Sequence, residues 1–316
     1  MHPGKPRIDP RVDFVAGDLG DQTAISAALD GVDVVSHQGA KVGLGVSFAD
    51  APHYVHTNSY GTAVLLAAME RAGIHRLVLA SSMVIYGEGA YTDPDTGQAV
   101  RPRPRTTEDL RLGMFDPRHP VTGNVLIPSL LTEDAVPDPP NIYAASKLNQ
   151  EHLASIWTRM TGSAAVALRY HNVYGPEMPK DTPYAGVASI FRSAIARGDA
   201  PRVFEDGAQR RSFIHVRDVA AANLAAIRFV LNQPTPLFRA YNVGSAEIRT
   251  IGDIAYALSK HSGGPPPVIT GESRLGDVRH ITASSERIKK ELGWTPTMGF
   301  DHGMAEFAAA PLRGTP

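Results

Sequence analysis

Short apolar runs alternate with segments of helical periodicity along the first half of the chain. Nearly continuous apolar runs are typical of parallel strands buried on both faces, and they predict strands at 11–17, 32–40, 76–83 and 164–173. Apolar residues that recur with a 3.6-residue period predict helices at 21–29, at 53–73 and from Tyr143 onwards. This alternation indicates an α/β fold with a doubly wound parallel sheet.

The second half of the chain has a more mixed pattern. Helices are predicted at 186–198, 216–233, 250–263 and 285–293, and short strands at 201–207, 212–216 and 239–244. We expect part of this half to form a smaller α/β lobe. Residues 88–140 are rich in Pro, Arg and Asp and show little periodicity. So long a segment is either functional or a surface excursion without a role.

Composition narrows the class of protein. The 316 residues are 43% hydrophobic and 20% charged, and the net charge is −1, so nothing favours a nucleic-acid partner. The absence of cysteine excludes disulfides and thiol catalysis. There is no apolar stretch long enough to span a membrane, no apolar core of a signal peptide and no metal-ligand spacing among the 12 His. A cytoplasmic enzyme without a metal is therefore expected.

Polar side chains follow several predicted strands, at the edge where open α/β sheets bind ligands. Asp18, His37, Ser82 and Asn172 hold such positions. Tyr143 and Lys147 are four residues apart, so they share one face of a predicted helix. Such a pair can occur by chance on a solvated face. Alternatively, the ammonium lowers the pKa of the phenol by about three units, or about 4 kcal/mol, so that the tyrosine acts as a base.

Six ordered motifs then point to a family. They are SSMVIYGE, YAASK, LRYHNVYGP, EDGAQRRSFIHVRDVA, YNVGS and RLGDVRHITASSERIKKELGW. Together they resemble the extended short-chain dehydrogenase/reductase family, the NAD-dependent epimerases and dehydratases. The resemblance implies a nucleotide-diphosphate sugar as substrate, a tightly held NAD and a homodimer paired through the 53–73 and Tyr143 helices.

The same resemblance implies roles for individual residues. Tyr143 resembles the catalytic base, Lys147 its partner, and Ser82 the hydroxyl that holds the reacting oxygen of the sugar. The implied cofactor contacts are Asp18, Leu19, His37, Gln38, Gly39, Asn58, Ala80, Ser81, Tyr143, Lys147, Tyr170, Asn172 and Val173. The implied substrate contacts are Ser82, Met83, Asn172, Val187, Arg211, Arg274 and Asp277.

The reaction type depends on two positions after Ser82. Dehydratases of this family carry an Asp–Glu pair there, whereas this chain has Met83 and Val84, which can neither donate nor accept a proton. This favours a 4-epimerase, and GAKVGLGVS, DLRLGMFDP and the region after Tyr170 resemble the dTDP-L-rhamnose 4-epimerase group. The alternatives are a dTDP-glucose 4,6-dehydratase, a UDP-glucose 4-epimerase and a truncated, non-catalytic sugar-nucleotide-binding protein.

The sequence also departs from the family pattern. It lacks the first strand with its G-x-x-G-x-x-G turn, which brings backbone amides to the NAD pyrophosphate. We therefore expect a Rossmann-like domain truncated at its N-terminus. Gly39 replaces a usual Ala and Ser212 a usual Asp. The expected division is an NAD-binding domain at 1–175, with about 212–245, and a nucleotide-sugar lobe at 176–211 and 246–316.

Overall fold

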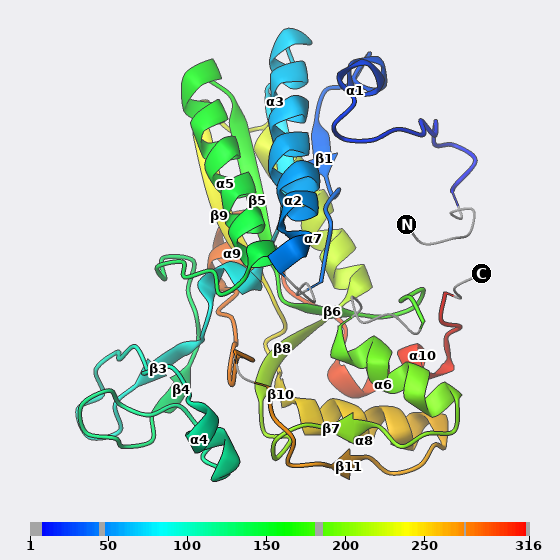
Figure 1. The fold of residues 1–316 in the computed structure, drawn as a ribbon. Coiled ribbons are helices and arrows are strands. Elements are labelled where there is room, and N and C mark those ends of the chain that lie inside the picture. The colour runs from blue at the N-terminus through cyan, green and yellow to red at the C-terminus, as the bar shows by residue number, and fades with distance from the viewer. Residues whose placement is uncertain (1–7, 44–47, 181–185, 275, 314–316) are drawn as a thin grey trace.

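A parallel sheet forms the centre of the molecule (Figure 1). The computed structural model describes residues 8–43, 48–180, 186–274 and 276–313. The start of the expected NAD-binding domain and the end of the expected nucleotide-sugar lobe lie outside the described residues. The strands pair in the order β1-β2-β5-β9. Their bounds are Val35–His37 for β1, Arg76–Ser82 for β2, Ala164–Tyr170 for β5 and Leu237–Val243 for β9.

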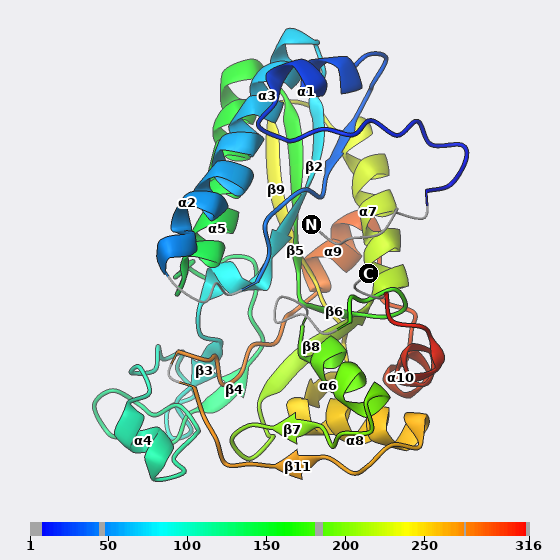
Figure 2. The same cartoon turned by 45° about the vertical axis from the view of Figure 1, so that its right-hand side comes forward.

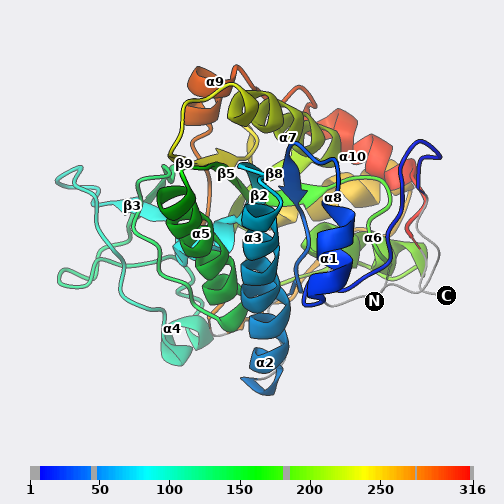
Figure 3. The ribbon, with the colours of Figure 1, turned by 90° about the horizontal axis from the view of Figure 1, so that it is seen from above.

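Helices cover both faces of this sheet (Figure 3). Leu77 and Leu79 of β2 pack on one face against α3 (Gly61–Arg71) and α5 (Ile142–Thr161). Val78, which points the opposite way, packs against α7 (Val216–Leu231) in a core that α9 (Glu286–Leu292) also joins. The prediction of a doubly wound α/β sheet is confirmed.

The predicted strand at 11–17 is wrong. These residues form no strand, and Val12, Phe14 and Val15 remain exposed. In the described part of the chain β1 is the last strand of the sheet at this end, and residues 11–17 pair neither with it nor with another described strand. Helix α1 (Gln22–Ala28) does form, because the Asp21 carboxylate accepts hydrogen bonds from the first amides of the helix.

The helix predicted at 53–73 contains an irregularity. A 3₁₀ turn, η1 (Phe48–Asp50), leads into α2 (Ala51–Tyr54), which continues as a π-helical segment, η2 (Val55–Tyr60), before α3 begins. Such π segments occur often at functional sites. This one contains Asn58, whose side chain is fully buried.

A second lobe with its own core lies beyond the carboxyl ends of the main strands (Figure 1). Its three-stranded sheet has the order β10-β8-β6. The strands are β6 (Asn172–Tyr174), β7 (Arg202–Val203), β8 (Arg210–His215), β10 (Ile248–Thr250) and β11 (Val268–Ile269). The helices are α6 (Val187–Ala196), α8 (Ile251–Ser262) and α10 (Phe300–Ala309), of which α10 was not predicted.

The aperiodic segment is an ordered excursion, which we define as residues 88–138. It contains β3 (Ala90–Thr92), α4 (Thr107–Arg111) and β4 (Ile127–Ser129), and it lies beside the second lobe (Figure 2). Its two ends meet, since the Asp138 amide donates to the Ile85 carbonyl at 2.9 Å. Gly87 allows this approach, because a Cβ there would lie 2.3 Å from the Asp138 carbonyl oxygen.

Candidate active site

Ser82 and Tyr143 meet at the carboxyl end of β2. Asn141 starts α5 by accepting a hydrogen bond from the Ala144 amide at 2.9 Å, which puts Tyr143 in the first turn of the helix. Burial raises the pKa of the Tyr143 phenol, and a side-chain interaction with Ser82 lowers it in part. The ring of Tyr54, 6.1 Å away between centroids, packs against the Tyr143 ring.

Lys147 lies on the same helix, but its ammonium has other partners. It is buried, and Nζ donates to the Ala80 carbonyl at 2.5 Å and to Gln150 Oε1 at 2.6 Å. Burial lowers the pKa of Lys147 to about 8, and the Glu151 carboxylate opposes that shift. Burial dominates the pKa of Tyr143 and raises it, and the lowering of that pKa by Lys147 stays a prediction.

Several expected cofactor contacts lie in the interior. His37 Nε2 is 2.9 Å from Thr62 Oγ1, and burial together with the nearby Lys147 charge lowers the pKa of His37 to about 4. Asn58 donates to the Lys41 carbonyl at 3.0 Å and to Ser146 Oγ at 2.8 Å. Both side chains are thus engaged with other groups of the protein.

Other expected contacts line the loops around the strand ends. The Asp18 carboxylate accepts from the Gly20 amide at 2.8 Å. Gln38 Oε1 accepts from the Tyr170 hydroxyl at 3.1 Å. Leu19 packs over Gly39, where a Cβ would lie 2.6 Å from Leu19 Cδ1, so an alanine here would require the end of the Leu19 side chain to shift. The remaining expected contacts are Ala80 and Ser81 in β2 and Val173 in β6.

The nicotinamide end of a bound NAD fits the residues at hand better than its pyrophosphate end. Asn172 Oδ1 is buried and has no hydrogen-bond partner in the described part of the chain, so it could accept a hydrogen bond from a ligand. Ser82, Tyr143 and Asn172 would face the reacting groups, and Lys147 would supply a positive charge. Gly17 and Gly20 precede α1 but follow no strand, so the strand–turn–helix arrangement that binds a pyrophosphate is not formed at these glycines.

The expected substrate contacts gather in the second lobe. Arg211 is half-buried and donates to the carbonyls of Val278 at 2.6 Å and Arg279 at 3.0 Å. The exposed Arg274 guanidinium stacks 4.6 Å from the Phe204 ring centroid. Burial raises the pKa of Asp277, while the charges of Arg274 and Arg211 lower it. Arg211, Arg274 and Asp277 thus form one charged region.

Three further positions that the sequence analysis named lie in regular elements of the fold. Met83 begins the 3₁₀ turn η3 (Met83–Tyr86) after β2, and Val187 begins α6. Ser212, which replaces the usual Asp, is buried and accepts from the Ala283 amide at 3.0 Å. The hydroxyl therefore has a structural partner of its own.

A buried polar network behind Ser82 was not predicted. Glu151 accepts from Ser81 Oγ at 2.5 Å and forms a two-pronged pair with Arg169 at 3.0 and 2.8 Å. Arg169 also donates to the Tyr86 hydroxyl, which donates in turn to Asn242, each at 2.8 Å. The spacing of Glu151, four residues after Lys147, could have indicated its place beside the lysine.

Across residues 8–43, 48–180, 186–274 and 276–313, no helix is long and apolar enough to cross a membrane. The same residues contain no group of three or more His, Cys, Asp or Glu side chains placed to hold a metal ion.

Comparison with known proteins gives the family. The NAD dependent epimerase/dehydratase family matches residues 2–108 and 121–244, and the chain belongs to this family. A dTDP-L-rhamnose 4-epimerase of Burkholderia thailandensis is 31% identical over 303 residues, which are 95% of this chain and 81% of the relative. A putative UDP-glucose 4-epimerase of Methanocaldococcus jannaschii is 28% identical, over 95% of this chain and 84% of the relative.

A solved structure agrees with the fold. The Thermus thermophilus UDP-glucose 4-epimerase in complex with NAD superposes with a TM-score of 0.73 and is 27% identical. The match covers 95% of this chain and 85% of that one. The expected family is confirmed, and the expected cofactor, NAD, is the one that the family's description names.

Proposed function

We propose that this protein is a nucleotide-sugar 4-epimerase that uses NAD and acts on a dTDP-L-rhamnose-type substrate. The observation behind the proposal is the end of β2, where Ser82 meets Tyr143 and is followed by Met83 and Val84. Met83 and Val84 carry no group that can donate or accept a proton. The site thus has a base for the 4-hydroxyl but no acid–base pair for expelling a C6 hydroxyl.

The chemistry follows from these groups. Tyr143 takes the proton of the sugar's 4-hydroxyl, and the Ser82 hydroxyl holds the oxygen from which it is taken. NAD, when bound, would supply reversible hydride transfer at C4, as epimerisation requires, and a positive charge beside the phenol. Such a charge is needed, because burial alone keeps the pKa of Tyr143 above its ordinary value. The dTDP-L-rhamnose assignment is supported by the Burkholderia thailandensis relative. The pairing of two copies through α3 and α5 stays a prediction.

The test uses the full chain with added NAD and dTDP-L-rhamnose. Proton NMR should detect interconversion with the C4 epimer, and Tyr143→Phe should reduce its rate about 10²–10⁴-fold. Tyr256→Phe is the matched control, since Tyr256 lies on α8 and is 54% exposed. Unchanged turnover in Tyr143→Phe would refute the assigned base. A 4-keto-6-deoxy product from dTDP-glucose would show a dehydratase instead, and turnover of UDP-glucose alone would change the assigned substrate.

A further inference from the structure

The excursion holds the loop that follows Arg274, which we call the 276–283 loop. The Glu88 carboxylate, at the start of the excursion, accepts from the backbone amides of Arg279 at 3.2 Å and His280 at 3.4 Å. The next residue must be a glycine, because a Cβ on Gly89 would lie 2.0 Å from the His280 carbonyl oxygen. The backbones of the two segments are therefore in direct contact.

The side chain of Arg279 is held from two sides. Its guanidinium is 1% exposed and pairs with Glu205 and Asp206 of the second lobe, at 2.8 and 2.7 Å. On the other side it pairs with Asp116 of the excursion at 2.8 Å. The same Asp116 oxygen lies 3.2 Å from His280 Nε2. Asp116 thus binds two successive residues of the 276–283 loop.

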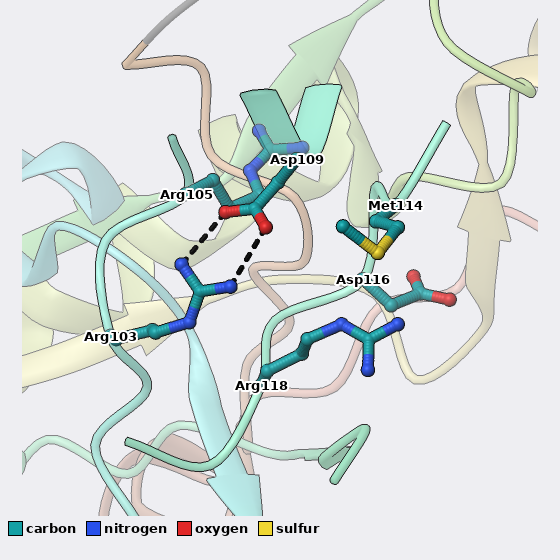
Figure 4. A pocket seen from close by; sticks show the side chains of 6 residues that line it. All are labelled: Arg103, Arg105, Asp109, Met114, Asp116 and Arg118. Atoms are coloured by element: carbon teal, nitrogen blue, oxygen red, sulfur yellow. Dashed lines mark hydrogen bonds and ion pairs between the residues drawn. The ribbon is translucent and has the colours of Figure 1, made fainter. Parts of the chain in front are cut away.

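A second arginine closes this network. Arg105 of the excursion pairs with Glu205 at 2.8 Å and also donates to the carbonyl of Asp277. Figure 4 shows Arg105 and Asp116 with the other residues that line this part of the excursion. Because Arg211 holds the carbonyls of the loop from β8, as described above, the loop is held from both the lobe and the excursion.

We propose that the excursion positions the 276–283 loop for binding the nucleotide diphosphate, and that Asp116 is a positioning residue in this role. The inference rests on the proposed function, and it takes Arg274 and Asp277 as the substrate contacts that the family resemblance implies. Asp116 acts through Arg279 and His280. Buried charges with several partners fix one geometry, so a loop held in this way keeps Asp277 beside Arg211 and Arg274 before any ligand arrives.

Two matched variants test the role. Asp116→Asn removes the charge that links the excursion to the loop, while Arg279 keeps Glu205 and Asp206. Asp109→Asn is the control, because Asp109 pairs with Arg103 at 2.7 and 2.8 Å entirely within the excursion (Figure 4). Calorimetry with dTDP and with UDP should show binding to the full chain weakened about tenfold in Asp116→Asn, the effect of one charge-assisted hydrogen bond.

The control variant should bind within about twofold of the parent chain, and both variants should keep kcat within about twofold, because the loss lies in substrate binding. Asp116→Glu restores the charge and should recover most of the affinity. Equal affinities in Asp116→Asn and Asp109→Asn would overturn the positioning role. A fall in kcat at unchanged affinity would overturn it as well.

A measurement without ligand separates this inference from the proposed function. Hydrogen exchange of the amides in 276–283 should be about tenfold faster in Asp116→Asn and unchanged in Asp109→Asn. Unchanged exchange in Asp116→Asn would refute the coupling of excursion and loop, whatever the substrate is. If the exchange result is as expected but the parent chain binds neither dTDP nor UDP, the nucleotide-sugar function fails, and the binding role of the loop fails with it.

Discussion

Replacing Glu151 with Gln should be among the most destabilising conservative changes in this protein. Glu151 and Arg169 are 4% and 8% exposed at their side chains, and their two-pronged pair lies behind β2. Removal of one partner from a buried pair leaves an uncompensated charge and costs about 3–5 kcal/mol. A chain of this size loses about 2 °C of melting temperature per kcal/mol, so we expect a fall of about 6–10 °C.

Glu108→Gln is the control for this prediction. Glu108 also pairs with an arginine, Arg111, but both side chains are more than 60% exposed, so solvent screens the pair and the loss should be much smaller than in Glu151→Gln. Thermal and urea unfolding of the two variants measure the difference. If Glu151→Gln lost no more stability than Glu108→Gln, the buried pair would not stabilise the fold as argued.

The same substitution should change the titration of Lys147. The folded pKa of Lys147 is about 8 and its ordinary value is 10.5, because burial disfavours the ammonium. The associated stabilisation is therefore present above pH 10.5, and it is lost as the pH falls through 8. Glu151 raises the pKa of Lys147, so Glu151→Gln should lower that pKa. The pH range in which stability is lost should then extend below pH 8. Urea unfolding between pH 7 and 10.5 would detect the shift, and an unchanged profile would contradict it.

Three further outcomes follow from local structure. Gly89→Ala should cost about 1–3 kcal/mol in thermal unfolding, because its Cβ would meet the His280 carbonyl, whereas Gly299→Ala, with nothing nearer than 3.9 Å, should cost less. The folded pKa of His37 is about 4, so its contribution to the free energy of unfolding should decrease by about 1.4 kcal/mol for each unit that the pH falls from 6.5 to 4. His37→Gln should remove this contribution from the urea-unfolding profile. Thr250→Ala breaks the capping box of α8 and should cost about 1 kcal/mol in urea unfolding.

The central sheet was predictable because its strands are marked by local pattern. The apolar runs at 76–83 and 164–173 became β2 and β5, which have neighbours on both edges. The run at 11–17 has a similar pattern and is not a strand, because strand formation depends on a partner that lies elsewhere in the chain. Nor does local sequence indicate the π-helical segment at 55–60, which depends on packing.

The candidate site was predictable where one helix or one strand end determines it. Ser82 and Tyr143 come together because a strand end and a helix start converge, and sequence order indicates both. The partners of Arg279 were not predictable, since they come from residues more than 70 positions away in the excursion and the second lobe. Long-range ion pairs of this kind leave no periodic pattern in the sequence.

The orientation of Lys147 shows the limit of spacing arguments. Four-residue spacing places lysine and tyrosine on one helical face. The lysine side chain is flexible, however, so its ammonium can reach any of several nearby acceptors. A buried ammonium takes the acceptors that best replace water, and here these are the Ala80 carbonyl and Gln150. Glu151 then helps to keep the pKa near 8, so that the group remains charged at neutral pH. The charge of Lys147 is therefore supported by a carboxylate four residues further along the helix, which also pairs with Arg169.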